Sequence, residues 1–244
     1  MTTPKIVAHR GFATQYPENT IEAFSAAIER GVVHIELDVQ LSGDRVPVII
    51  HDDNMERTAG VALSVIDMPV GVLSQYTVGE AARLGDVFSS AKLPRLVNLV
   101  TLLEAHPQVT AYVELKDESL ERFGVEQMVD ICIEALRPVI SQVVIISYND
   151  SCLEYVRTCA GCPIGWVLSR WDDESRQLAE RLSPNILICN YKKINNELWQ
   201  GPWSWFLYEI ADPELALNWI DQGVEYIETM DIEALLDRLP NQGS

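Results

Sequence analysis

Four charged residues stand at the ends of two apolar, strand-like runs. Glu36 and Asp38 in the stretch HIELDV are two residues apart, as are Glu114 and Lys116 in YVELK, so each pair projects from one face of its strand. Burying carboxylates is costly unless a positive charge pairs with them. The three carboxylates could therefore hold one hard divalent cation, with water or substrate oxygens completing its shell. A Glu–Lys salt bridge without a metal is the alternative interpretation.

Two of the four histidines also stand at the carboxyl ends of predicted strands. His9 follows KIVA and precedes Arg10, and His51 ends the run VPVIIH. Many α/β proteins place their chemistry at such strand ends. We interpret His34 as a packed core residue and His106 as a loop residue.

Imidazoles, carboxylates and cationic groups that meet at the carboxyl ends of several strands suit phosphoryl chemistry. A metal ion and basic side chains can neutralise the non-bridging oxygens of a phosphodiester. One imidazole can remove a proton from an attacking hydroxyl while the other protonates the departing alkoxide. An imidazole titrates near neutral pH, which suits both tasks.

These residues need a scaffold that brings several strand ends together. Near-continuous apolar strands with amphipathic segments between them imply a parallel sheet covered on its outer faces. The number of such units in 244 residues favours a (β/α)8 TIM barrel, of class α/β, over an open sheet. A barrel of this kind has eight strands, so one of the nine candidates must lie outside it or be misread. The candidates are residues 5–8, 33–39, 46–51, 110–116, 142–147, 163–169, 185–190, 205–210 and 224–229.

Start and stop signals define several of the helices. Asn19 in PENT is predicted to cap the helix IEAFSAAIER, which stops at Gly31. One amphipathic segment is expected over 119–137 and another over 172–182, and a third opens at Asp212.

One connection is far longer than an ordinary strand–helix link. Residues 52–108 hold only short periodic pieces. We therefore expect a single barrel domain, 1–244, with a small insertion of about 52–108 between strands 3 and 4. The insertion would either flank the mouth of the active site or simply pack against the barrel.

The net charge of −18 restricts the partners of the chain. Contacts with nucleic acid need clustered Lys and Arg, and the sequence has no basic run. The same deficit disfavours an anionic membrane surface, and no stretch approaches the ~18–20 apolar residues of a membrane span. We expect a small-molecule substrate, no nucleic acid and no stable membrane insertion. The oligomeric state does not follow from the sequence.

The cysteines and the N-terminal sequence indicate the cytoplasm. Five cysteines, an odd number in a chain of this length, fit a reducing compartment. Cys159 and Cys162 form a CxxC with no two further zinc ligands nearby, so we interpret them as free thiols. The first strand begins almost at once, which predicts no signal peptide.

The motifs AHRGFATQYPENT, IELDV, VIIHDDNMERT and VELK, in this order and spacing, closely resemble the bacterial glycerophosphodiester phosphodiesterase family. The resemblance is strongest over residues 5–58 and returns at 113–116, at 146–148 and near the C-terminus. It implies a phospholipase-C-like TIM barrel and an enzyme, a phosphoric diester hydrolase. Such an enzyme cuts glycerophosphodiesters, such as glycerophosphocholine or glycerophosphoethanolamine, to sn-glycerol 3-phosphate and an alcohol.

The resemblance also implies roles for nine residues, matched by position. In the family, the substrate's neighbouring glycerol hydroxyl is commonly proposed as the nucleophile, through a cyclic phosphate. His9 and His51 match the general acid–base pair, and Glu36, Asp38 and Glu114 match the ligands of one Mg²⁺ or Ca²⁺ ion. Arg10 and Lys116 match the phosphate-binding residues, and Glu18 and Asn19 match the loop supports.

The chain departs from the family pattern near its C-terminus. Residues 208–211 read YEIA where the last barrel strand of the family usually reads like WTVN, and Thr229 is followed by Met230 instead of an aspartate. Glu209 is thus a new carboxylate near an anion site, and we hypothesise that it alters the preference for the head group. An unchanged ranking of head groups after Glu209→Thr would contradict this.

Three other functions are alternatives to this one. Lys116 could form a Schiff base in an aldolase-type enzyme, which leaves two histidines and three acids unexplained. A barrel that binds phosphodiesters without turnover is expected to have lost a histidine or a metal ligand, and none is missing. A related enzyme acting on lysophospholipids would need an apolar surface for an acyl chain, and this alternative stays open.

Overall fold

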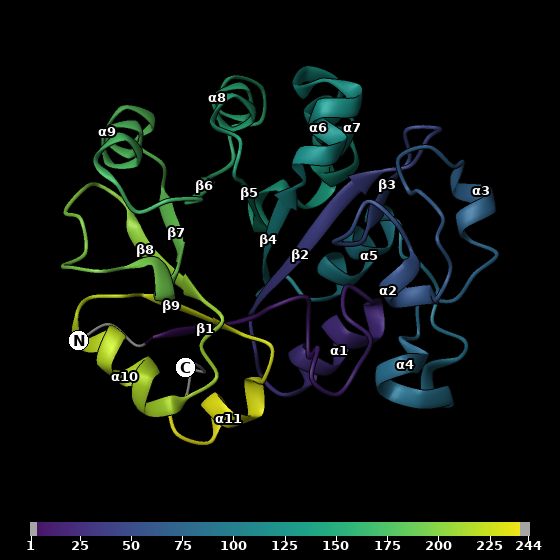
Figure 1. Cartoon of the computed structure of the whole chain (residues 1–244), viewed down its shortest axis with the longest axis horizontal. Coiled ribbons are helices and arrows are strands. Elements are labelled where there is room, and N and C mark those ends of the chain that lie inside the picture. The colour runs from purple at the N-terminus through teal and green to yellow at the C-terminus, as the bar shows by residue number, and fades with distance from the viewer. Residues whose placement is uncertain (1–3, 240–244) are drawn as a thin grey trace.

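The computed structural model, which describes residues 4–239, contains a closed barrel of eight parallel strands (Figure 1). Strand β1 pairs with β2 on one side and with β9 on the other, which closes the sheet. The predicted (β/α)8 barrel is confirmed. Its strands are β1 (Lys5–Ala8), β2 (His34–Leu41), β4 (Thr110–Leu115), β5 (Val143–Ser147), β6 (Ile164–Val167), β7 (Ile186–Asn190), β8 (Ser204–Tyr208) and β9 (Tyr226–Thr229).

The ninth strand, β3 (Pro47–Ile49), lies outside the barrel and runs antiparallel to β2. Strand β2 extends past the barrel rim, and the turn after Leu41 sends the chain back along it. The amide of Ile50 donates to the carbonyl of Asp38 at 3.0 Å. Because β3 runs antiparallel to the extension of β2, its carboxyl end lies at the barrel rim, where the carboxyl ends of the parallel strands also lie. His51 follows β3 and therefore lies at the mouth of the barrel.

Helices surround most of the barrel, as α/β alternation requires. Between β7 and β8 the chain forms only the short η3 (Tyr191–Lys193) and a tryptophan-containing loop. No helix within residues 4–239 combines the length and the apolar character needed to cross a membrane. The helices around the barrel are α1 (Ile21–Glu29), α5 (Leu96–Ala105), α6 (Asp117–Phe123), α7 (Val125–Leu136), η2 (Arg137–Gln142), α8 (Asp150–Cys159), α9 (Asp173–Leu182), α10 (Pro213–Asp221) and α11 (Ile232–Leu236).

The single amphipathic segment expected over 119–137 is wrong, because two helices occupy it. Gly124 separates α6 from α7 with a φ of 88°, a left-handed conformation that cannot continue a helix. The helix expected over 172–182 is confirmed, with Asp172 as its N-cap. Asp212 likewise caps α10 by accepting from the amide of Leu215.

Strand alternation divides the apolar residues into two layers. Ile35 and Leu37 of β2 point outward and belong to the large core between the barrel and its helices. Tyr112, Phe206 and Tyr226 point inward and fill the barrel with close ring contacts. His34 packs against Tyr112 and Tyr226 in this layer, as predicted. The interior is therefore plugged by apolar rings below the polar mouth.

The segment after β2 builds a small body beside the barrel (Figure 1, blue). Its own core includes Met55, Val65 and Leu73. Helix α5, at its end, packs into the main core like any other barrel helix. The sequence predicts an insertion of about 52–108, but α5 belongs to the barrel, so we propose one domain, 1–244, whose insertion spans about 42–95. The insertion contains α2 (Glu56–Ala59), α3 (Val70–Leu73), α4 (Ala81–Leu84) and η1 (Gly85–Phe88).

Gly11 allows the sharp exit from β1, and its replacement is expected to be costly. It has a φ of +83°, and a Cβ there would lie 2.7 Å from the backbone carbon of Ala23 in α1. We expect Gly11→Ala to lower the free energy of unfolding, measured with urea, by about 2–4 kcal/mol through strain and overpacking.

Gly31 provides the matched control, since its φ is +89° and a Cβ there meets nothing within 4 Å. Gly31→Ala should cost only the backbone strain, about 1–2 kcal/mol. Equal losses in the two variants would show that the contact with Ala23 is relieved by a small shift.

Candidate active site

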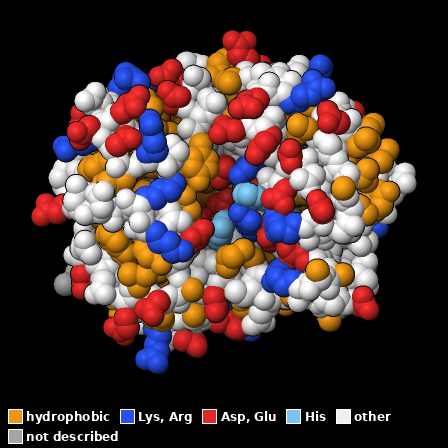
Figure 2. Space-filling model, in the orientation of Figure 1, with side chains coloured by type: hydrophobic (Ala, Val, Ile, Leu, Met, Phe, Trp, Pro, Cys, Tyr) orange, Lys and Arg blue, Asp and Glu red, His pale blue; other side chains and the backbone are white. Residues whose placement is uncertain are grey.

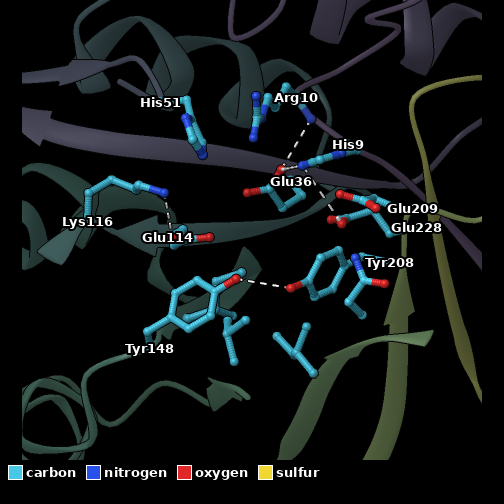
Figure 3. A pocket seen from close by; sticks show the side chains of 14 residues that line it. His9, Arg10, Glu36, His51, Glu114, Lys116, Tyr148, Tyr208, Glu209 and Glu228 are labelled. Carbon is cyan, nitrogen blue, oxygen red and sulfur yellow. Dashed lines mark hydrogen bonds and ion pairs between the residues drawn. The ribbon is translucent and has the colours of Figure 1, made fainter. Parts of the chain in front are cut away.

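A cavity of about 220 Å³ opens at the carboxyl ends of the barrel strands. In Figure 2, histidine side chains lie in a central hollow with acidic and basic side chains around it. Figure 3 shows the same pocket from close by. The lining residues come from β1, β2, β4 to β9 and the arm after β3. They are His9, Arg10, Glu36, His51, Glu114, Lys116, Ile146, Tyr148, Val167, Ile188, Asn190, Tyr208, Glu209 and Glu228.

Three of the predicted acids form one cluster at the mouth. Glu36 and Asp38 of β2 face inward together, and the register of the sheet sets Asp38 beside Glu114 of β4. One carboxylate oxygen from each of the three lies within 4.8 Å of the others. Oxygen ligands gathered this closely suit a hard divalent cation such as Mg²⁺ or Ca²⁺. The donor set therefore fits a metal ion, and it includes every metal ligand that the sequence predicted.

The crowding of these acids shifts their protonation. Burial, and then Asp38 and other nearby carboxylates, raise the pKa of Glu36 well above its usual range. Burial and Asp38 likewise raise the pKa of Glu114 to about 7. Burial opposes ionisation of Asp38 as well, but Arg10 and Lys116 hold the pKa of that carboxyl below its usual range. Without a cation the cluster is short of positive charge.

The two predicted phosphate-binding cations lie on opposite sides of Asp38. Arg10 Nε is 3.1 Å from Asp38 Oδ2, and Lys116 Nζ is 3.5 Å from Asp38 Oδ1. Lys116 also donates to Glu114 at 2.9 Å. Although burial opposes it, Asp38 and Glu114 raise the pKa of Lys116, so its ammonium stays charged. Both cations line the cavity and can meet an anion there.

His9 is the more buried of the two predicted acid–base residues. Its side chain is 14% exposed, with Nε2 at 3.9 Å from Glu36 and 4.0 Å from Glu228. Burial, and then the charge of Arg10, lower the pKa of His9 to about 4. The imidazole is therefore neutral at pH 7 and has a nitrogen lone pair that can accept a proton.

His51 is oriented by a carboxylate that sequence reasoning did not single out. His51 Nδ1 lies 2.7 Å from Asp52 Oδ1, and Arg57 Nε donates to the other oxygen of Asp52 at 2.9 Å. This arrangement leaves His51 Nε2 free for the cavity (Figure 3). The motif HDDNMERT contains all three residues, but a pairing of neighbours in a loop has no periodic signal.

The two predicted loop supports lie behind the cavity. Glu18 accepts two hydrogen bonds from Arg57, at 2.7 and 2.8 Å, and one from Arg10 at 3.0 Å. Asn19 donates to the carboxylate of Asp38 at 2.9 Å and accepts from its amide at 3.2 Å. These contacts tie the first loop to β2 and to the insertion.

The prediction that Asn19 caps α1 is wrong by one residue. Thr20 is the N-cap, and its hydroxyl accepts from the amide of Ala23 at 3.2 Å. Asn19 has a φ of 57° and turns its amide toward Asp38 instead. Two hydrogen bonds to a buried strand residue outweigh one to a helix end, because the strand groups have no water to replace them.

The far wall of the cavity comes from the C-terminal strands. The hydroxyls of Tyr148 and Tyr208 lie 3.0 Å apart (Figure 3). Glu209 pairs with Lys192 at 3.1 Å near the surface. Glu228 of β9 also points into the cavity. Sequence reasoning missed Glu228, although strand alternation puts it on the same face as Tyr226.

Comparisons with known proteins point to one family. The sequence profile of the Glycerophosphoryl diester phosphodiesterase family matches residues 9–201, a span that holds all nine predicted site residues and ends before β8. A glycerophosphodiester phosphodiesterase of Caldanaerobacter subterraneus subsp. tengcongensis is 29% identical over 98% of each chain. One from Bacillus altitudinis is 35% identical over 53% of this chain and 52% of its own.

Solved structures share the fold. A phosphodiesterase of Oleispira antarctica, in complex with the product sn-glycerol-3-phosphate, has a TM-score of 0.84 and 22% identity, covering 97% of this chain and 96% of its own. A glycerophosphodiester phosphodiesterase from Agrobacterium tumefaciens has a TM-score of 0.75 and 22% identity, covering 95% of this chain and 99% of its own.

Proposed function

The chain belongs to the glycerophosphoryl diester phosphodiesterase family and is a phosphoric diester hydrolase, and from this premise we propose its substrates and mechanism. It hydrolyses glycerophosphodiesters such as glycerophosphocholine or glycerophosphoethanolamine to sn-glycerol 3-phosphate and an alcohol. The reaction depends on one divalent cation, Mg²⁺ or Ca²⁺, and on two histidines. The observation that carries the proposal is the meeting of two imidazoles, three carboxylates and two cationic side chains at one cavity.

The first task of the site is to hold a phosphodiester. A divalent cation on Glu36, Asp38 and Glu114 would neutralise charge on a non-bridging phosphate oxygen. Arg10 and Lys116 line the same cavity and would contact the other oxygens. Since both side chains are held by carboxylates, they are already in place when the anion arrives. Such prepared charges stabilise the transition state without further rearrangement.

The second task is to move two protons. His9 is neutral at pH 7 because burial lowers its pKa, so it can take the proton of the attacking glycerol hydroxyl. The hydroxyl oxygen bonds to phosphorus, and the bond to the departing alcohol breaks. His51, oriented by Asp52, then supplies the proton to the departing oxygen. Water opens the resulting cyclic phosphate with the two imidazoles in exchanged roles.

The charge state of Lys116 argues against an aldolase. A Schiff-base lysine must lose its proton before it attacks a carbonyl. Lys116 has the opposite environment, because Asp38 and Glu114 raise its pKa. No observation in the site favours the aldolase over the phosphodiesterase.

We also propose that the protein acts in the cytoplasm. None of the five cysteines forms a disulfide within residues 4–239, and Cys159 and Cys162 of the CxxC are among them. Free thiols support a reducing compartment.

A release assay tests the proposed function. The purified protein is incubated with glycerophosphocholine and glycerophosphoethanolamine in Mg²⁺, Ca²⁺ or EDTA, and glycerol 3-phosphate is followed through a coupled dehydrogenase. His9→Ala and Glu36→Ala proteins run alongside. We expect release that requires a cation and that both substitutions abolish.

A folded protein that releases no glycerol 3-phosphate with either ion would overturn the proposal. Lysophospholipids would then be tested as substrates. Release that is indifferent to EDTA would overturn only the metal dependence.

Asp52 is expected to act by orienting His51. Asp52→Asn removes a charge-assisted hydrogen bond and should lower kcat about 10- to 100-fold with little change in KM. The adjacent Asp53→Asn is the matched control, because Asp53 does not line the cavity and bonds only to its own loop. Steady-state kinetics of both variants across pH 6–9 would check this. Equal kcat values for the two would contradict an orienting role.

A further inference from the structure

Glu228 is a buried carboxylate that the mechanism above does not use. It lies on β9, one step above the inward-facing Tyr226, and points into the cavity beside His9 (Figure 3). Only 4% of the residue is exposed. Its carboxylate has no hydrogen bond from any residue in the described part of the chain, 4–239. Glu228 lines the cavity, so a molecule bound there can supply the hydrogen bond that this carboxylate lacks.

Within residues 4–239 the neighbouring cationic side chains form no hydrogen bond or ion pair with Glu228. Arg10 is engaged with Asp38 and Glu18, and Lys116 with Asp38 and Glu114. His9 Nε2 is 4.0 Å from Glu228 Oε2, too far for a hydrogen bond. A molecule bound in the cavity can therefore donate a hydrogen bond to this carboxylate.

The gap between His9 and Glu228 has the size of one hydroxyl group. An oxygen placed ~2.8 Å from each atom would bridge them with an angle of roughly 90° at the oxygen. We propose that Glu228 binds a substrate hydroxyl there: the hydroxyl shares its single proton between the two acceptors, Glu228 Oε2 and His9 Nε2, and Glu228 holds the oxygen within reach of His9. Under the proposed function, on which this inference rests, it is the glycerol hydroxyl on the carbon next to the phosphoester. Glu228 is then a specificity-determining residue that selects diesters carrying this hydroxyl.

A second metal ion is the main competing occupant, since His9, Glu36 and Glu228 also offer atoms within 4.8 Å of one another. The other nitrogen of His9 argues against it. A metal-bound imidazole almost always donates its second N–H to an acceptor. His9 Nδ1 is buried without a hydrogen-bond partner. A choline group would interact with Glu228 through its charge alone, because a quaternary ammonium has no N–H to donate.

Ligand pairs that differ in one hydroxyl test the proposal without turnover. Calorimetric titrations in Mg²⁺ compare sn-glycerol 3-phosphate with 3-hydroxypropyl phosphate, which lacks the adjacent hydroxyl. We expect the wild type to prefer the first by about 10- to 100-fold, and Glu228→Leu to reduce that preference to within about threefold. Glu228→Gln, which keeps hydrogen-bonding atoms, should retain part of it.

Glu225→Gln is the matched control, because Glu225 lies just before the same strand and accepts from Ser204 away from the cavity. Thermal unfolding checks that every variant folds. An equal loss of affinity for both ligands in Glu228→Leu would overturn the proposal. A lower count of bound metal ions in Glu228→Gln, measured by elemental analysis, would replace it with the second cation site.

The release assay separates the two proposals. If the wild type releases glycerol 3-phosphate but Glu228→Leu keeps the full preference for the hydroxyl, only the role of Glu228 fails. If the wild type releases none, the proposed function fails, whatever the titrations show.

Discussion

His9→Gln and His51→Gln should each lower kcat for glycerophosphodiesters by about 10²–10⁴-fold while the protein stays folded. Each variant removes one of the two groups proposed to move protons, and both side chains line the cavity. Neither imidazole anchors the fold, because His9 makes no side-chain hydrogen bond and His51 only one, to Asp52. Rapid kinetics would measure kcat, and circular dichroism would check folding.

The double variant distinguishes a shared mechanism from two independent effects. If the two histidines act on one reaction in concert, His9→Gln with His51→Gln should lose far less than the product of the single losses. His106→Gln is the matched control, since His106 ends α5 away from the site and should keep wild-type kcat. A drop of less than tenfold in both single variants would contradict acid–base catalysis by this pair.

The parts of the fold that sequence predicts well are those in which local pattern and tertiary environment agree. Apolar runs of four to eight residues between capped helices predicted all nine strands. Alternation along β2 predicted that Glu36 and Asp38 share a face, and the sheet register then brought in Glu114. All parallel strands of a barrel end at the same rim, so the fold class alone predicts that these three residues lie close together.

Features decided by contacts between distant segments could not be predicted. Strand β3 has the same apolar composition as a barrel strand, and only its hydrogen bonds to β2 reveal that it runs antiparallel outside. Asn19 and Thr20 are both good N-caps, and a bond to Asp38, distant in sequence, selects Thr20 for the helix. In both cases the local sequence favours two alternatives almost equally, and contacts with distant residues decide between them.

Glu228 escaped prediction for a related reason. In the run VEYIET, alternation puts Tyr226 and Glu228 on one face and Ile227 on the other, but both faces of a barrel strand are buried. Apolar content alone does not reveal which face points inward. The match to the family profile ends at residue 201, and the resemblance near the C-terminus assigned no role to Glu228.

Removal of divalent ions should abolish activity and leave a protein that loses stability as pH rises. Burial and Asp38 raise the pKa of Glu114 to about 7, above its ordinary 4.5, so the folded state holds this proton more tightly than the unfolded chain does. The resulting stabilisation is complete below about pH 4.5 and disappears as pH rises through 7. From Glu114 alone the loss is on the order of 1–3 kcal/mol. Urea unfolding in EDTA between pH 5 and 8 would measure it.

Glu114→Gln separates this electrostatic cost from the packing of the mouth. In the wild type Lys116 donates a hydrogen bond to Glu114 at 2.9 Å, and the amide of Gln can still accept it. In EDTA the variant should therefore be as stable as the wild type near pH 5 and more stable than the wild type near pH 8. It should also gain less stability from Mg²⁺ than the wild type, which we expect to gain about 2.7 kcal/mol when the ion is at 100 times its Kd. Glu134→Gln, which removes an exposed partner of Arg137, should change neither property.

A Glu114→Gln variant destabilised equally at every pH would mean that the Lys116 ion pair, rather than repulsion among the acids, determines the contribution of Glu114 to stability. The cluster would then be a structural salt bridge, and the affinity for a cation would have to come from Glu36 and Asp38 alone.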